Sequence, residues 1–317
     1  MSAIEQIKQP FAAFVASLAL YLAAVVVPVV GSVFLPLTAQ PLARLGLRAG
    51  NLAALGAIIA ASCALYAAGG EALALGYLLI ASMALFLLYA LAPGRALERV
   101  VLLAASGVFA LGVATLHALA GSFAALKEIA RKTLDENLRL ALSVYEKAGV
   151  SRESTDFIRE QWPGVLEFLL VILPGLAFAA SAIAVLLNLL LLIRRFGADK
   201  AGVLPGGDPR EWKAPEPLVW IFIASGFGAL VFEEGWIRAP SLNVLLVSAL
   251  CYFFQGFAII AYYFHHKKVP VLLRALGYAL IFLEPTVILV VTGLGLFDLW
   301  IDFRRLNKKE LHPTQAA

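Results

Sequence analysis

Four polar side chains lie inside long apolar stretches of this sequence: Glu284, Asn188, Gln255 and His117. The most unusual is Glu284, which lies near the centre of the last apolar run and directly precedes Pro285. A carboxylate at mid-bilayer costs at least a few kcal/mol unless it is paired, protonated or facing a cavity. Proline also frees a backbone carbonyl one turn earlier. Glu284 is therefore either part of a ligand, ion or proton site, or a neutral glutamate hydrogen-bonded inside a helical bundle.

The three other residues have the same two interpretations. Asn188, Gln255 and His117 could line a polar pocket together with Glu284 and bind a small molecule. Each could equally form a hydrogen bond between helices, which is worth about 0.6 kcal/mol on average. His117 lies near the end of its apolar run and could face interfacial water. We expect Glu284 to face the protein interior and to contact a polar group of another helix.

Motifs for catalysis, cofactors and metals are absent from the sequence. It contains no nucleophile–base constellation, Walker loop, Gly-rich dinucleotide turn or HExxH motif. His265 and His266 would point about 100° apart on a helix and so share one ion poorly. Cys63 and Cys251 lie in apolar runs and fit small buried hydrophobic residues. We therefore expect a protein that is not an enzyme, with no catalytic, cofactor-binding or metal-binding residues.

The elements that carry these residues must lie in lipid. Hydrophobic residues make up 62% of the chain, charged residues 15%, and the mean hydropathy is +0.88. An ordinary soluble domain has about 45–50% apolar and about 25% charged residues. The sequence therefore predicts an all-α, polytopic transmembrane bundle. The net charge of +4 comes from basic residues in short loops beside apolar runs, so nucleic acid is not an expected partner.

About 20 apolar residues are needed to span a bilayer. Eight runs approach or exceed that length, and we expect about eight spans, with a range of seven to nine. A further stretch, residues 31–45, is short and interrupted by Pro36 and Pro41, so it is either a kinked ninth crossing or a re-entrant element. The eight runs are residues 11–30, 51–68, 72–92, 100–120, 165–193, 218–232, 242–264 and 275–296.

The composition changes between residues 121 and 163. This segment has seven basic and seven acidic residues, and its apolar residues recur at helical spacing. Gly149 suits a helix end and Ser151 a new N-cap, so we expect an amphipathic insert of two helices outside the membrane. The predicted domains are residues 1–120 with four membrane helices, or five if 31–45 crosses, the insert 121–163, residues 164–303 with four membrane helices, and a polar tail, 304–317.

The distribution of Lys and Arg predicts the orientation of the chain. With nine spans and a cytoplasmic N-terminus, thirteen of these residues lie on the cytoplasmic side and five on the other, leaving out the neutral insert. Basic residues flank both ends of the last apolar run. Either the tail is external, or the run folds back near Glu284 and Pro285. We expect one ordinary helix.

The part of the chain from about residue 174 to residue 305 resembles the YybS-like family of bacterial membrane proteins, a group of unknown function. That family is similar, more distantly, to the membrane-embedded substrate-binding components of energy-coupling-factor vitamin transporters. The resemblance implies docking to a partner through small residues on the first helix, and Ala12/Ala16 and Ala19/Ala23 have that spacing. The residues that carry the resemblance are Asn188, Arg194-Arg195, Arg210-Glu211-Trp212, Pro215, Tyr252-Phe253, Gln255-Gly256, Lys267-Lys268, Pro270 and the run from Gly295 to Arg304.

Two functions remain open at this point. The first is a membrane-embedded component that binds or transports a small molecule, which requires a polar cavity reached by Glu284, Asn188 or Gln255. The second is a structural or assembly protein with a dry bundle, which binds protein partners through residues 121–163 and the basic loops. The expected partners are the lipid bilayer, a small molecule in the first case and other membrane-protein subunits in the second. The expected location is a bacterial inner membrane.

Overall fold

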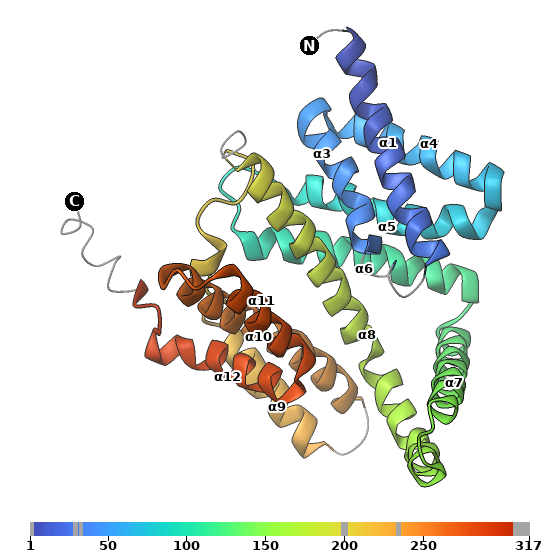
Figure 1. The fold of residues 1–317 in the computed structure, drawn as a ribbon, viewed down its shortest axis with the longest axis vertical. Helices are drawn as coiled ribbons and strands as arrows, with labels where there is room; N and C mark the ends of the chain where they lie inside the picture. The colour runs from blue at the N-terminus through green and yellow to red at the C-terminus, as the bar shows by residue number, and fades with distance from the viewer. Residues whose placement is uncertain (1–2, 28–30, 32–33, 198–201, 233–235, 307–317) are drawn as a thin grey trace. The chain divides into compact units, whose positions relative to one another are not determined.

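The structure, a computed structural model, describes residues 3–27, 31, 34–197, 202–232 and 236–306. These residues form helices and connecting turns without a strand, which confirms the predicted all-α class (Figure 1). In chain order the elements are α1 Ala3–Val26, η1 Leu35–Thr38, α3 Ala39–Ala49, α4 Asn51–Gly69, α5 Glu71–Ala90, α6 Leu97–Ala120, α7 Phe123–Lys147, α8 Arg152–Phe196, η2 Pro209–Glu211, α9 Leu218–Val231, α10 Arg238–His266, α11 Val271–Leu283 and α12 Pro285–Ile301.

Within the described ranges, six helices are long and apolar enough to cross a membrane: α1, α4, α5, α6, α8 and α10. A seventh crossing results if α11 and α12, which meet at an angle of 102°, count as one span. With that pair counted as one span, the described residues reach the lower limit of the expected range of seven to nine, below the central value of eight. The difference lies partly in α9, whose 14 residues measure about 21 Å, short of a hydrocarbon core of about 30 Å.

The chain divides into two compact units. Unit 1 consists of Met1–Trp162 and Ala180–Gly206, and unit 2 of Pro163–Ala179 and Gly207–Ala317. Helix α8 contributes to both, because its central residues belong to unit 2 and its two ends to unit 1.

In unit 1, α1 and α5 run antiparallel. Ser17 Oγ lies 2.9 Å from the Tyr77 hydroxyl, and the Tyr21 hydroxyl donates to the Leu73 carbonyl at 3.0 Å. The chain then returns along α1 through η1 and α3. The Thr38 carbonyl accepts a hydrogen bond from Ser17, and a Cβ on Gly46 would meet the Leu88 side chain near the end of α5. Residues 35–49 thus run back across the unit as a 3-10 turn followed by a short α-helix.

The prolines explain why this return segment, residues 35–49, is not one helix. Pro36 lies at the start of η1 and Pro41 in the first turn of α3, where a residue without an N–H costs no helical hydrogen bond. The Arg48 guanidinium, near the end of α3, lies 5.1 Å from the centre of the Phe196 ring. Arg48 therefore lies at the same end of unit 1 as the C-terminus of α8.

The amphipathic insert begins as predicted. The Ser122 hydroxyl caps α7 by accepting from the Ala125 N–H, Gly149 has a positive φ of 82° after α7, and Ser151 caps α8. The second insert helix is not separate, however. Helix α8 continues through Pro163 and on into the apolar run, to Phe196.

In unit 2, α9 and α11 both run antiparallel to α10. Phe222 of α9 packs against Tyr252 with ring centres 5.5 Å apart, and a Cβ on Gly228 would meet Ser241. On α11, the rings of Tyr278 and Phe264 pack with their centres 5.4 Å apart.

Helix α12 crosses α10 where two glycines let the backbones touch. A Cβ on Gly256 would meet the Val291 carbonyl, and one on Gly295 the Tyr252 carbonyl.

Candidate functional site

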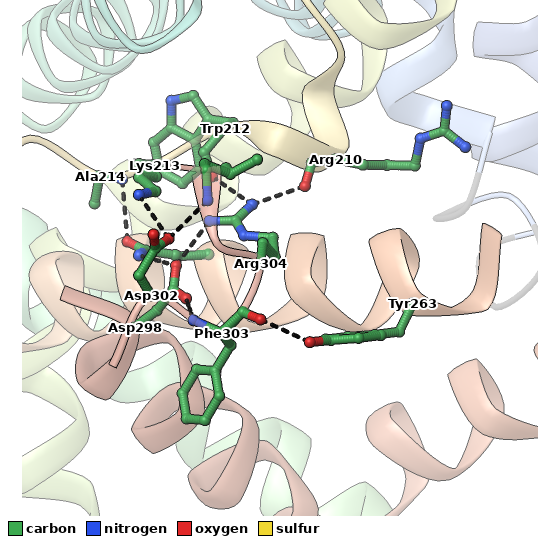
Figure 2. Close-up of polar contacts among 11 residues, drawn as sticks. Arg210, Trp212, Lys213, Ala214, Tyr263, Asp298, Asp302, Phe303 and Arg304 are labelled. Atoms are coloured by element: carbon green, nitrogen blue, oxygen red, sulfur yellow. Dashed lines mark hydrogen bonds and ion pairs between the residues drawn. The ribbon is translucent and has the colours of Figure 1, made fainter. Parts of the chain in front are cut away.

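The end of α12 carries a fully buried ion pair. Arg304 Nη2 lies 2.8 Å from Asp298 Oδ2, and neither side chain is exposed (Figure 2). Gln255 of α10 donates from Nε2 to the same carboxylate oxygen at 3.0 Å, and the Phe303 N–H donates to the other at 2.9 Å. Both oxygens of Asp298 therefore have partners, as a buried carboxylate requires.

The Arg304 side chain also forms hydrogen bonds with the loop that precedes α9. Arg304 Nη1 donates to the carbonyls of Arg210 and Trp212 at 2.7 and 3.0 Å, and the Ala214 N–H donates to Gln255 at 3.0 Å (Figure 2). These contacts join the loop, α10 and the end of α12 into one network. We call it the loop–helix lock.

Two further contacts lie next to the loop–helix lock. Lys213 Nζ lies 3.0 Å from Asp302 Oδ1, and the Tyr263 hydroxyl donates to the Phe303 carbonyl at 2.7 Å (Figure 2). Asp302 has a positive φ of 45°, a conformation that Asp tolerates better than most residues. This turn directs the chain back so that Arg304 reaches Asp298.

An ion pair outside the lock orders the start of the loop. Arg210 contacts both carboxylate oxygens of Asp208, with Nη2 to Oδ2 at 2.7 Å. The hydrogen bonds from Arg210 lower the pKa of Asp208, and the pKa of Arg210 is raised in turn. Both side chains are about one-third exposed, so the pair contributes at most about 1 kcal/mol. That contribution is present above the ordinary pKa of Asp and is lost as the pH falls through the lowered value.

A second polar cluster lies in unit 1, around the return segment. Asn188 of α8 donates from Nδ2 to the Pro36 carbonyl at 2.8 Å and to the Ala184 carbonyl at 2.8 Å. The Thr38 carbonyl accepts from Ser17 at 2.8 Å. Irregular backbone at membrane depth is tolerated where protein or a cavity satisfies its polar groups. Here, side chains of α1 and α8 satisfy two of them.

Several side-chain atoms of this cluster have no such partner. Thr38 Oγ1, both polar atoms of the Gln40 amide and Asn188 Oδ1 are buried and form no hydrogen bond with the described residues. Each unsatisfied buried polar group costs about 1–3 kcal/mol. In the loop–helix lock, Arg304 Nε is left without a partner among the described residues, whereas this cluster leaves four side-chain atoms unpaired. The other buried polar side chains described in unit 1 are also uncharged, namely Ser17, Ser62 and Thr155.

A family model described as "Predicted membrane protein (DUF2232)" matches residues 15–299. The chain belongs to this family. No curated protein and no solved structure matches it. The likeness to transporter substrate-binding components therefore stays a prediction.

The four sequence-predicted site residues of this DUF2232 chain are divided between the two units, with Asn188 and His117 in unit 1 and Gln255 and Glu284 in unit 2. Asn188 is buried in the unit 1 cluster, and Gln255 is buried in the loop–helix lock of unit 2. His117, in the last turn of α6, is half-buried. Its ring centre lies 4.3 Å from that of Phe123, and its Nδ1 has no hydrogen-bond partner in the described part of the chain.

The prediction that Glu284 faces the interior is wrong. Its side chain is exposed and makes no hydrogen bond or ion pair with the described residues. The expected single helix is also wrong, because the run breaks at this residue. A residue before proline is driven out of the helical region, and Glu284 has φ −111° and ψ 107°, while Pro285 starts α12.

Sequence reasoning missed Thr38, Gln40 and Asn243 in this DUF2232 chain. The first two lie in the proline-interrupted stretch, and polar residues there were the available signal. Asn243 of α10 inserts its amide into the backbone of α8. It accepts from the Gly175 N–H at 2.5 Å and donates to the Val171 carbonyl at 2.8 Å, beside Pro174. A side chain that enters a helix ladder in this way is a recognised cause of helix distortion.

Proposed function

We propose that this protein is a small-molecule-binding component of its membrane, and that the binding site is the unit 1 cluster around residues 35–40 and Asn188. The supporting observation is the set of unpaired polar atoms on Thr38, Gln40 and Asn188, beside a segment that forms a 3-10 turn followed by a short α-helix. In membrane transporters, interrupted helices at mid-membrane supply backbone and side-chain groups to substrates. A ligand would satisfy the hydrogen bonds that the fold leaves open.

The chemistry of the cluster favours an uncharged, polar ligand. The Gln40 amide offers both a donor and an acceptor, Asn188 Oδ1 an acceptor, and Thr38 Oγ1 either role. A buried ion would require a compensating charge, and the buried polar side chains described in unit 1 are all neutral. The proposal is for binding without catalysis, since the cluster holds no acid/base pair. The location that we propose is the bacterial inner membrane, on the basis of the charge asymmetry.

Replacing Gln40 by Leu tests this proposal. Leucine removes two unsatisfied polar atoms from a buried position, so the ligand-free protein should gain stability, by about 1–3 kcal/mol. We also expect a small molecule to co-purify with the wild type in detergent and to be lost from Gln40→Leu. Thermal unfolding gives the first result, and mass spectrometry of small molecules extracted from the purified protein gives the second.

Ser62→Ala is the matched control, because Ser62 is buried in the same unit but bonds within its own helix, to the Ile58 carbonyl at 2.8 Å. It should retain the co-purified molecule. A decrease in the stability of Gln40→Leu would show that Gln40 has a partner in the fold. Equal amounts of bound molecule in Gln40→Leu and the wild type would place the binding site elsewhere.

A second candidate function, the assembly of other membrane proteins, is favoured by the surface of α7. Ile129, Leu140 and Val144 are 53%, 66% and 61% exposed and are spaced so that they share one helix face. Exposed apolar faces of this kind mark contacts with lipid or protein. Under this alternative, serine at the three positions would release a protein partner and leave any bound small molecule unchanged.

A further inference from the structure

Helices α11 and α12 begin and end beside the C-terminal half of α10. Helix α11 starts at Val271, one short turn after α10 ends at His266. Phe303 directly follows α12, and its carbonyl accepts a hydrogen bond from the hydroxyl of Tyr263, which lies near the end of α10. A straight helix over the same 31 residues would be about 46 Å long and would end near Arg238, at the start of α10. The chain instead ends beside Gln255 and Tyr263, in the half of α10 from which it left.

The break at Glu284 makes this return possible. Helix α11 runs down the side of α10 until Phe282 meets Phe253, with ring centres 6.1 Å apart. There the chain turns by 102°. Helix α12 then crosses α10 at Gly256 and brings Asp298 to Gln255.

The loop before α9 lies at this same end of unit 2. Helix α9 is antiparallel to α10, so its first residue and the last residue of α10 lie on one side. The ion pair between Lys213 and Asp302 and the bonds from Arg304 to the loop carbonyls join that loop directly to the end of α12. Four chain segments of unit 2 therefore meet at one end.

The basic residues of unit 2 are also concentrated at the end where these segments meet. In the described part of unit 2, seven Lys and Arg residues lie at this end, and Arg238 is alone at the other. A straight last span would move Arg304 and Arg305 across the membrane, against the tendency of basic residues to gather on one face. The seven residues are Arg210, Lys213, Lys267, Lys268, Arg274, Arg304 and Arg305.

We infer that α11 and α12 form a re-entrant element, which enters and leaves the membrane on one face and places residues 303–306 on the same face as the loop before α9. Fold geometry and charge distribution point to this arrangement independently. The exposed cations at the two ends of the element, Lys267, Lys268 and Arg305, then face one membrane surface, where anionic lipid headgroups stabilise them.

Single cysteines in the full-length protein test this inference. The native cysteines are first replaced by Cys63→Ala and Cys251→Ala. Lys268→Cys, Gln315→Cys and Ala316→Cys should then react with a membrane-impermeant maleimide from the same side, and Trp236→Cys from the opposite side. Labelling is compared between intact cells and inverted membrane vesicles. Labelling after solubilisation in denaturing detergent measures the total protein in each sample.

The comparison does not depend on which face is cytoplasmic, because Lys268 and Trp236 serve as internal references for the two faces. Reaction of both tail cysteines from the side of Trp236 would overturn the inference and make α11 and α12 a single broken span. Reaction of both from the side of Lys268 supports the re-entrant element.

Discussion

Replacement of Arg304 by Met should lower the free energy of unfolding by about 3–5 kcal/mol, the typical cost of removing one partner of a buried ion pair. Methionine has a similar length but no charge. The Asp298 carboxylate would keep Gln255 and the Phe303 N–H as partners but would lose its cation in a place without solvent. The carbonyls of Arg210 and Trp212 would lose their donor as well. Thermal unfolding of the purified protein in detergent measures the loss.

The double replacement Asp298→Asn with Arg304→Met should be less destabilising than the sum of its single changes, because it removes the uncompensated charge. An exposed pair provides the control. Arg159 and Glu146 lie 2.8 Å apart with side chains about half exposed, so Arg159→Met should cost at most about 1 kcal/mol. Equal losses for Arg304→Met and Arg159→Met would show that the lock does not hold the loop.

Local sequence signals predicted the helix ends well. Gly149 and Ser151 act through groups within a few residues, and the structure uses each as predicted. The ion pair of Arg304 with Asp298 likewise joins residues only six positions apart. Such interactions need little knowledge of the remaining fold.

Features that depend on other helices were not predictable in the same way. Whether a helix break becomes a kink or a 102° turn depends on what packs against it, and the contacts of α12 with Gly256 are far from Pro285 in sequence. The exposure of Glu284 follows from that turn. The expectation of a separate second insert helix also failed, because in α8 an amphipathic segment and an apolar span form one continuous helix across Pro163.

The candidate site was predictable only in part. Asn188 stood out because amides are rare in apolar runs, and it does lie in the unit 1 cluster. Gln255 had the same signal but belongs to the loop–helix lock, where its amide joins Asp298 to the Ala214 N–H. Sequence shows that such a side chain needs partners. Only the packing shows whether the fold supplies them, as for Gln255, or leaves them open, as for Gln40.

Replacement of Gly295 by Ala should destabilise the protein by about 3 kcal/mol or more, near the upper end of the usual cost of overpacking. The added Cβ would meet the Tyr252 carbonyl and would lie 2.7 Å from the Gly256 backbone nitrogen. Both are main-chain atoms of α10, so no side-chain rotation relieves the clash. Helix α12 would have to move away from α10, and Asp298, three residues later, would move away from Gln255.

Gly293→Ala is the matched control in the same helix, because no atom of a neighbouring described element lies within 4 Å of the Cβ it would add. Alanine is the better helix former by about 0.5–1 kcal/mol, so this variant should be as stable as the wild type or slightly more stable. Thermal unfolding of both variants in the same detergent measures the difference. If the two substitutions have the same effect, α12 does not cross α10 in direct backbone contact. If only Gly295→Ala unfolds early, the close crossing is what holds the loop–helix lock together.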